Sequence, residues 1–535
     1  MKKINILAIL SALILTAFMA ACAEDHAIEN SQEQQPQKVG TTFIGTNSIK
    51  LADNPATRTS IDYKFGENNF KFFWEPGDVV WDYNKFDYFT SNITERTGIA
   101  TFTSSRQYTD EEILLSYSGP FSGAPYSVIF SGEFTQSEPN NTKHLSSGGD
   151  CGIGKAKKRS NGTYRFTIEH RSAYLCLLPR TPNGLTSTVI TKVTIISDNA
   201  IIGYSGLQAD GSLSPLAGGT GQDLTKQVIN LGSSGQGFPL NNAQTSQETN
   251  AIYSVIYPGT HALTIEYTLK DTHTNVETTV TKTIPSQNYE PNTLTPITAN
   301  LTLPTLNLKY YMWDAKKGHD VTYGHLDADG NYDKNYPRDN TDPRWFHENP
   351  GGVAGPLAAT ESCENYPNVN ELFWYYLKGD AHWEDNAGVQ VMNGYLEEIK
   401  GLWLRKKSVI LAYLKANGYP ATLTENDLKN SYKDTPTATP IDYRITCSPA
   451  VNPSITPTPG RPANTADYFF LPAAGGYSIW GGGFLDMFGT YGWYWSSSAC
   501  PNNINYAYNL TFSSSTVIVF YQNNRTSGYP ERPFE

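Results

Sequence analysis

The chain has 535 residues, with 40 Lys and Arg against 51 Asp and Glu and a net charge of −11. This length predicts about three domains. Because the cations form no basic stripe, the composition argues against a surface for nucleic acid, which needs clustered positive charge to contact phosphates.

The first 21 residues have the pattern of a secretory signal peptide. Two lysines precede an apolar stretch over residues 4–19, and Ala20 and Ala21 precede Cys22. Signal peptidases need small residues before the cut, and the apolar stretch is too short for a lasting membrane span. We expect lipidation of Cys22; an ordinary cleaved signal with an incidental cysteine is the alternative.

Residues 22–38 form a polar run rich in Gln and Glu, which cannot bury a core and is expected to act as a flexible tether. Glu24 and Asp25 follow Cys22 closely. This arrangement resembles the surface-export signal of Bacteroidetes lipoproteins, which implies a place on the outer face of the outer membrane, held there by the lipid anchor.

Residues 39–302 have the pattern of an all-β region. Stretches of alternating apolar residues are broken by clusters of Gly, Pro, Asn and Ser, as in Ile61, Tyr63 and Phe65 or Leu263, Ile265 and Tyr267. The span fits two sandwich domains of ordinary size, over residues 39–181 and 182–302, with the Thr-Pro-Asn-Gly turn at 181–184 as the expected boundary.

Residues 303–535 differ in composition, since Trp and Tyr become dense and helical patterns appear. One helix is expected from Asn368 to Leu377, with Asn368 as its cap and Gly379 as its stop. A second is expected from Tyr395 to Ala416. Strands and Gly-rich loops follow, so this region is predicted to be an α+β domain.

A motif in the first half carries a family resemblance. The stretch Phe73-Trp74-Glu75-Pro76-Gly77-Asp78-Val79-Val80, preceded by Thr57-Arg58-Thr59, resembles the fimbrillin-like surface proteins of Bacteroidales. The resemblance implies two tandem transthyretin-like β-sandwiches.

The same resemblance implies a role for Arg58 and Thr59. In such pilins an arginine-specific protease removes the leading strand, and a neighbouring subunit fills the groove with its own strand. Residues Thr41 to Leu51 would be the strand removed here, other pilin subunits would be the partners, and the cut would fall at Arg58-Thr59. The alternative is that Arg58 is a solvated arginine before a strand.

A second resemblance lies in the last third. It is carried, in order, by Tyr468-Phe469-Phe470-Leu471-Pro472-Ala473, Tyr491-Gly492-Trp493-Tyr494-Trp495-Ser496-Ser497-Ser498, Ala507-Tyr508-Asn509-Leu510 and Arg532-Pro533. This block resembles the C-terminal domain of fimbrial tip proteins, which is similar to C-type lectin folds. The expected fold class is therefore mostly β, with two sandwiches followed by an α+β C-type-lectin-like domain.

Aromatic residues on or next to the glycine-rich loop from Gly475 to Gly492 are the candidate ligand-binding residues. Aromatic rings on such loops stack on sugars or fit protein pockets, so a surface glycan or protein is the expected ligand. The alternative is that they form the core of the domain. The candidates are Tyr477, Trp480, Phe484, Tyr491 and Trp493.

Metal and cofactor signals are weak. Asp327, Asp329, Asn331 and Asp333 place oxygens on alternate residues, but Gly330 does not occupy the EF-hand position, and a solvated turn is the alternative. The Trp-Asn-Asp motif of calcium-dependent lectins does not occur. No cofactor is expected.

No catalytic residues are predicted, because the sequence has no HExxH, G-x-S-x-G or Walker motif. Besides Cys22 there are five cysteines, none in a CxxC pair. Their pairing is not deducible from the sequence. Taken together, the patterns predict a fimbrial tip subunit or adhesin rather than an enzyme, with a stand-alone surface lipoprotein or a basal pilus anchor as the alternatives.

Overall fold

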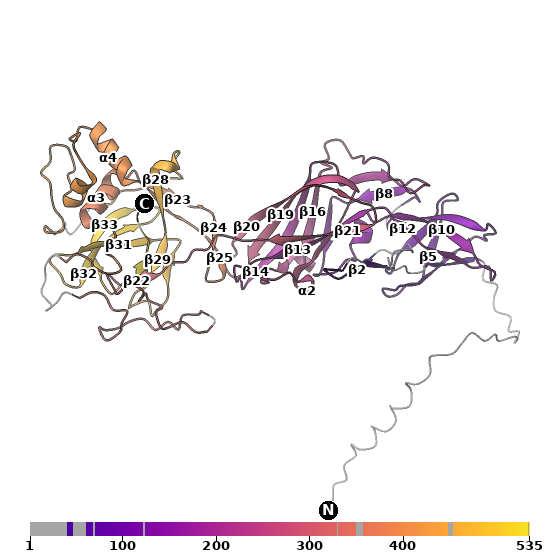
Figure 1. Cartoon of the computed structure of the whole chain (residues 1–535), viewed down its shortest axis with the longest axis horizontal. Coiled ribbons are helices and arrows are strands. Elements are labelled where there is room, and N and C mark those ends of the chain that lie inside the picture. Colours follow the sequence, from indigo (N-terminus) through magenta and orange to yellow (C-terminus); the bar gives the residue numbers. More distant parts are fainter. Residues whose placement is uncertain are drawn as a thin grey trace, which may run out of the picture.

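The computed structural model describes residues 40–45, 60–67, 70–120, 123–328, 330–348, 357–447, 453–532 and 534. The described chain is elongated, with a strand-built first part that runs from β1 to β21 and a second part that holds β22 to β34 (Figure 1). Strands greatly outnumber helices, which confirms the mostly β fold class. Cys22, Arg58, Thr59 and Asp329 lie outside the described residues.

The first part begins with a sheet that closes on itself. Its order is β11-β1-β6-β5-β4-β7-β10-β12, and β10 also pairs with β11, so the strands from β11 to β10 form a closed ring. Large aromatic and aliphatic side chains fill its interior. The strands are β1 Thr41–Gly45, β4 Val79–Asp82, β5 Asp87–Ser91, β6 Ala100–Ser104, β7 Glu112–Tyr117, β10 Gly152–Lys158, β11 Tyr164–Phe166 and β12 Glu169–His170.

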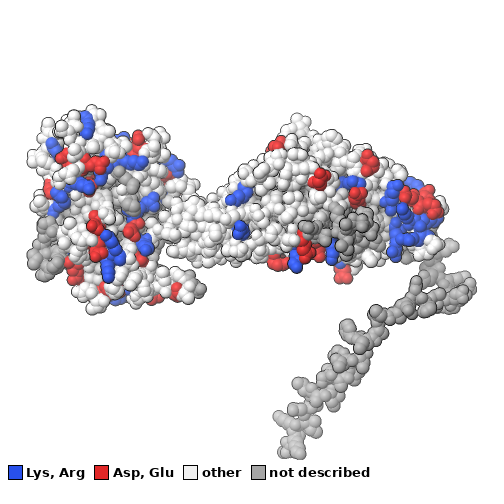
Figure 2. All heavy atoms as spheres, viewed as in Figure 1, with Lys and Arg blue, Asp and Glu red and all other residues white. Residues whose placement is uncertain are grey.

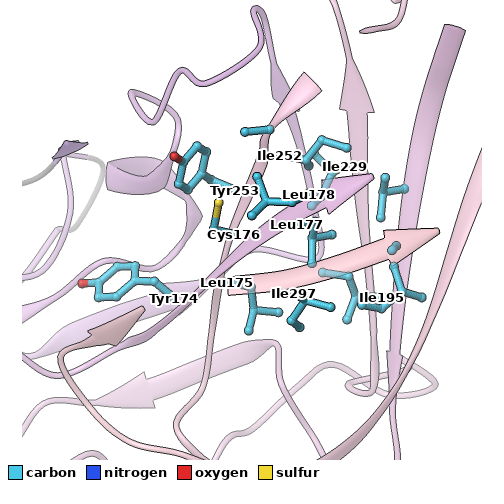
Figure 3. Close-up of a cluster of buried hydrophobic side chains, with 14 of the residues drawn as sticks. Tyr174, Leu175, Cys176, Leu177, Leu178, Ile195, Ile229, Ile252, Tyr253 and Ile297 are labelled. Atoms are coloured by element: carbon cyan, nitrogen blue, oxygen red, sulfur yellow. The ribbon is translucent and has the colours of Figure 1, made fainter. Parts of the chain in front are cut away.

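A second core lies between two further sheets, of order β18-β13-β21 and β20-β19-β14-β16-β9, with β17 paired to β14. Along β19 buried and half-buried residues alternate, as the sequence pattern predicts. Figure 3 shows the apolar side chains of β13 meeting those of the opposite sheet. The strands are β9 Glu133–Gln136, β13 Ala173–Arg180, β14 Thr188–Ser197, β16 Lys226–Leu231, β17 Phe238–Pro239, β18 Ile252–Ile256, β19 Gly259–Asp271, β20 Glu277–Tyr289 and β21 Thr293–Asn300.

Small elements complete this part. Two short sheets pair β2 with β3 and β8 with β15. These elements are β2 Ser60–Tyr63, β3 Phe70–Phe73, β8 Ser127–Phe130, β15 Gly203–Gly206, α1 Leu145–Gly148, α2 Gln247–Asn250 and the 3-10 helix η1 Ser233–Gly235.

The strand pairing crosses the expected boundary near residue 181. β13 precedes that position but pairs with β18 and β21, which both follow it, and β9 pairs with β16. Ile61, Phe72 and Val128 also belong to the second core. Segments before residue 181 therefore contribute to both cores. In particular, β13 is the central strand of the sheet β18-β13-β21, although the other two strands follow it in sequence.

The hairpin of β24 Val389–Met392 and β25 Tyr395–Glu398 links the two parts (Figure 1). Val391 and Leu396 are buried in the second core of the first part. The backbone amide of Leu396 donates to the Asp271 carboxylate at 3.2 Å. Apolar and polar contacts thus fix the hairpin to the sheets that enclose the second core.

Among its described residues, the last domain combines strands with three α-helices and one 3-10 helix. A core surrounds α3 and includes residues of β26, β31, β32 and β33. The elements are β22 Tyr310–Tyr311, α3 Val369–Lys378, β23 His382–Glu384, β26 Gly401–Arg405, α4 Lys407–Ala416, α5 Glu425–Asn430, β27 Thr458–Pro459, the 3-10 helix η3 Thr465–Asp467, β28 Tyr468–Pro472, β29 Ala474–Gly476, β30 Asp486–Phe488, β31 Gly492–Ala499, β32 Tyr506–Phe512, β33 Val517–Asn524 and β34 Tyr529–Pro530.

The first predicted helix is confirmed as α3. The Asn368 side chain accepts from the Glu371 amide at 3.1 Å, and the Glu371 carboxylate accepts from the Asn368 amide at 2.9 Å. This reciprocal pair is a capping box, which satisfies two amides that have no partner inside the helix. Gly379 ends the helix, as predicted.

The second predicted helix is wrong over its first half. Residues 395–405 form β25 and β26, and only Lys407–Ala416 are helical. Asn393 and Gly394 both have positive φ, 51° and 83°, which suits the two-residue turn of a hairpin. A Cβ atom at Gly401 would lie 2.2 Å from the Leu471 carbonyl oxygen, so glycine permits the close pairing of β26 with β28.

Among the described residues, no helix has the length and apolar character needed to cross a bilayer. Figure 2 shows Lys and Arg side chains gathered at the end of the molecule where β10 lies, while charged residues are sparse on the visible face of the second sandwich.

Candidate functional site

The first candidate site is the place of β1 in the closed ring. β1 pairs antiparallel with β6 and parallel with β11, so both of its edges are hydrogen bonded. It is the leading strand of the described chain, and residues 46–59, which separate it from β2, are not described. The expected strand from Thr41 to Leu51 therefore corresponds to β1 over residues 41–45.

Alternate side chains of β1 enter the core. Phe43 is fully buried and stacks on Phe89 and Tyr164, with ring centroids 4.2 and 4.9 Å away. Thr41 is buried and accepts from the Tyr108 amide at 3.0 Å. The strand thus contributes a central aromatic side chain as well as backbone pairing.

Gly45, the last residue of β1, lies against two aromatic rings that leave little room for a side chain. A Cβ atom there would lie 3.0 Å from the Trp74 ring and 3.1 Å from the Phe166 ring. A strand that occupies this place needs a large apolar residue at the level of Phe43, and a residue larger than glycine two positions later requires the Trp74 and Phe166 rings to shift.

Removal of β1 would expose two strand edges at once. β6 and β11 would lose their shared neighbour, and the rings of Phe89, Tyr108 and Tyr164 would lose the side chain that covers them. Unpaired edges next to apolar pockets are the features that bind an added strand.

The second candidate site is the loop between β29 and β30 in the last domain. Its backbone is held at its beginning, since Tyr477 exchanges two 2.8 Å hydrogen bonds with Gly528. The Ser478 hydroxyl accepts from the Gly481 amide at 2.9 Å and shapes the turn. Gly483 lies so close to the backbone of Lys334 that a Cβ atom added to it would be 2.0 Å from the Lys334 carbonyl oxygen.

Two of the five predicted aromatic residues are exposed on this loop. The Trp480 side chain is 92% exposed and that of Phe484 is 55% exposed. The Lys334 ammonium lies 4.2 Å from the centre of the Phe484 ring, which places a cation against an aromatic face. An indole this exposed adds nothing to the core, so it is available to stack on a ligand.

Tyr477 has a structural role instead. Its ring meets Tyr310 edge to face at 5.0 Å and stacks on Tyr336 at 6.4 Å. Burial raises the pKa of Tyr477 above its ordinary value. Tyr477 therefore anchors the base of the loop, in keeping with the alternative that some of these aromatic residues belong to the core.

Tyr491 and Trp493 form a half-buried ladder. Their rings stack at 5.4 Å with an angle of 5°, and Trp493 stacks on Tyr529 at 5.8 Å. The ladder ties β31 to β34, and Tyr491 at its end is half-buried. The structure thus divides the predicted residues into an exposed pair, an anchor and a ladder.

Further exposed apolar residues lie in the segment that precedes Lys334. Tyr323 is 45% exposed and stacks on His319 at 4.0 Å, and Leu326 is 53% exposed. No sequence signal marks them, because a single Tyr or Leu among polar residues has no pattern that separates it from a core residue.

The described carboxylates of the candidate metal site accept hydrogen bonds from neighbouring residues. The Asp327 carboxylate accepts from the Asn331 amide at 2.8 Å, and Asp333 accepts from His325 at 2.8 Å. The described part of the chain holds no group of three acidic, His or Cys side chains arranged for a metal ion. The oxygens therefore shape a turn, which is the alternative reading of this segment.

The sequence matches no protein-family model and no curated protein. Among solved structures, it is similar to candidate cell adhesion proteins from Bacteroides ovatus and Bacteroides uniformis, at 12% and 14% identity and a TM-score of 0.29 for both. Each match covers 49% of this chain, and 91% and 94% of the other chains.

A fimbrial protein from Bacteroides ovatus is also similar, at 11% identity and a TM-score of 0.20, over 92% of this chain and 98% of that one. At these identities and TM-scores the structures are neighbours of the chain and define neither its family nor its function.

Proposed function

We propose that the protein is a cell-surface subunit of fimbrial type, in which β1 is removed after export and replaced by a strand of a neighbouring subunit. The observation that carries the proposal is that five residues close the ring and place Phe43 at its centre. Strand exchange requires such a separable strand, since the incoming strand must restore both the backbone pairing and the apolar side chain.

The expected cut at Arg58-Thr59 suits this exchange. It falls between Gly45, the last residue of β1, and Ser60, the first residue of β2. Cleavage there separates β1 from the chain without breaking any other strand of the described residues. Lipidation at Cys22 would hold the uncut protein at the outer membrane, and the cut would release it from that anchor.

The last domain is the proposed binding end. It lies at the opposite end of the molecule from the ring that holds β1 (Figure 1). The last described strand, β34, pairs with β22 at the start of the same domain and is engaged there. A subunit that accepts a strand at one end and presents an aromatic loop at the other suits the tip of a fibre.

The mature N-terminus tests the processing step. We expect protein from the surface of its native host to begin at Thr59 by intact mass and N-terminal sequencing. Arg58→Ala should block the cut, whereas Lys50→Ala, which removes the other cation between β1 and β2, should leave it unchanged. A diacylated chain beginning at Cys22 in all three proteins would contradict the proposal.

That contrary result would favour a second function, a stand-alone surface lipoprotein that keeps β1. The observation in its favour is that β1 is fully seated, with both edges paired and Phe43 buried. In that case the last domain still binds a glycan or protein, but no fibre is assembled. A basal pilus anchor would instead retain β1 and show no ligand binding.

Ligand binding is tested with the full chain on an array of host and bacterial glycans and on host surface proteins. We expect Trp480→Ala to lower binding by about fivefold or more, since loss of an aromatic contact of this kind costs more than about 1 kcal/mol. Phe86→Ala is a matched control, because Phe86 is as exposed as Phe484 but lies in the first ring. Equal binding by both variants would remove the loop from the proposal.

A further inference from the structure

Two cysteine sulfurs lie close together in the last domain. Cys447 Sγ and Cys500 Sγ are 3.8 Å apart, although 53 positions separate the residues in sequence. Cys500 follows the end of β31 and is 1% exposed, and its amide donates to the Tyr506 carbonyl at 3.0 Å. Cys447 is half-buried.

The other described cysteines have surroundings of a different kind. Cys151 contacts the Ser172 hydroxyl at 3.4 Å, and Cys363 Sγ accepts from the Asp314 amide at 3.2 Å. Cys176 is fully buried between β18 and β21 in the second core. Among the described cysteines, the contact between Cys447 and Cys500 is the one in which two sulfurs meet.

We propose that Cys447 and Cys500 form a disulfide in the exported protein, while Cys151, Cys176 and Cys363 remain thiols. The bond joins the two sulfurs and releases two protons and two electrons. The electrons reduce the disulfide of a thiol oxidant in the oxidising compartment, which becomes two thiols. During folding, before burial raises the thiol pKa, one of the two cysteines attacks the oxidant as a thiolate, and the other then displaces the reduced oxidant from the mixed disulfide.

The bond would enclose the aromatic loop. Residues 448–499 lie between the two cysteines and include Trp480 and Phe484. A crosslink limits the unfolded conformations of the segment it closes, so it favours the folded arrangement of the loop and its supporting strands. With this one bond, three of the five cysteines stay unpaired, which agrees with their odd number.

The environment favours a structural bond over a reactive thiol. Burial and the neighbouring Cys500 raise the pKa of Cys447 to about 11, so the reduced thiol stays protonated at neutral pH. A catalytic or redox-sensing thiol has the opposite tendency, with a lowered pKa that favours the thiolate.

Peptide mapping tests the pairing on the full chain purified from an oxidising compartment. Free thiols are alkylated before any reduction. Trypsin is unsuitable, because residues 445–525 contain no lysine and only one internal arginine, Arg461, which precedes a proline. Endoproteinase Asp-N cuts before Asp442, Asp467 and Asp486 and places the two cysteines in separate peptides, 442–466 and 486–535.

The expected product is peptide 442–466 linked to peptide 486–535, with a mass two hydrogens below the sum of the two, and it disappears on reduction. In Cys447→Ser the second peptide should be alkylated at Cys500 and linked to nothing. Alkylation of both cysteines in the unreduced wild type would overturn the inference. A link from Cys500 to Cys151, Cys176 or Cys363 would also overturn it.

Discussion

The strand-built first part begins with a ring closed by β1, whereas the last domain is closed by contacts between its own beginning and end. β1 spans only residues 41–45 and meets the rest of the ring through β6 and β11. In the last domain, β22 pairs with β34, and the Trp313 amide donates to the Arg525 carbonyl at 2.9 Å.

Under the proposed function, this difference would let one chain combine a replaceable strand with a stable last domain. Loss of a terminal strand uncovers a defined groove, while the rest of the ring is held by other pairings. Where the first and last strands of a domain pair with each other, neither can leave without unfolding their shared core. The four predictions that follow compare the two parts, from the largest expected effect to the smallest.

The largest effect is expected at the centre of β1. Phe43→Ala should destabilise the first part by about 3–5 kcal/mol, because it removes a fully buried ring and leaves a cavity between Phe89 and Tyr164. Thermal unfolding followed by hydrogen exchange should show the loss in the ring but not in the last domain. Thr42→Ala is the control on the same strand, and an equal loss from it would contradict a specific role for Phe43.

Lowering the pH should decrease the free energy of unfolding of the first part. Burial lowers the pKa of His144 to about 4 and also lowers the pKa of His261. Since each unfolded histidine binds a proton near pH 6.5 and the folded one does not, stability decreases as pH falls from 7 to 5. For His144 the loss is up to about 2 kcal/mol over this range.

The check is the pH dependence of chemical unfolding. His144→Gln, which removes the titrating ring, should have a shallower slope between pH 7 and 5 than the wild type. An unchanged slope would show that protonation of His144 has no part in acid weakening.

A smaller effect is expected at the cap of α3 in the last domain. Asn368→Ala should cost about 1 kcal/mol, because the Glu371 amide loses its capping partner. Asn368→Asp keeps an acceptor at this position and should retain most of the stability. Denaturant unfolding of the last domain measures both, and equal losses would indicate that packing rather than capping explains the effect.

The smallest effect on stability is expected at the exposed loop. Trp480→Ala should change the free energy of unfolding by less than about 0.5 kcal/mol, since the indole is 92% exposed. Trp495→Ala, which removes a buried indole from the same domain, should cost about 3–5 kcal/mol. A large loss from Trp480→Ala would mean that the ring packs against the protein and is not free for a ligand.

The sequence predicted the mostly β architecture and α3, because alternation and capping residues are local signals. It did not reveal β25 and β26, since Leu396, Ile399 and Leu402 also recur at helical spacing. The Asn393-Gly394 turn before them is the local signal for a hairpin. The interleaving of the two cores depends on pairing between β13 and later strands, which no local pattern encodes.

Prediction of the candidate sites shows the same limit. The sequence selected five aromatic residues, but only the fold distinguishes the exposed Trp480 from the anchor Tyr477. It also left the cysteine pairing open, because the approach of Cys447 to Cys500 depends on the packing of distant segments.

Strand replacement is the most direct test of the central claim. The full chain is cleaved after Arg58, and the labelled peptide of residues 39–47 is then added in excess, beside a peptide with Phe43→Asp. We predict that the wild-type peptide displaces β1 and leaves the ring as stable as before, while the variant peptide does not displace it. If the cleaved protein takes up neither peptide, or both equally, β1 is not a replaceable strand of the ring.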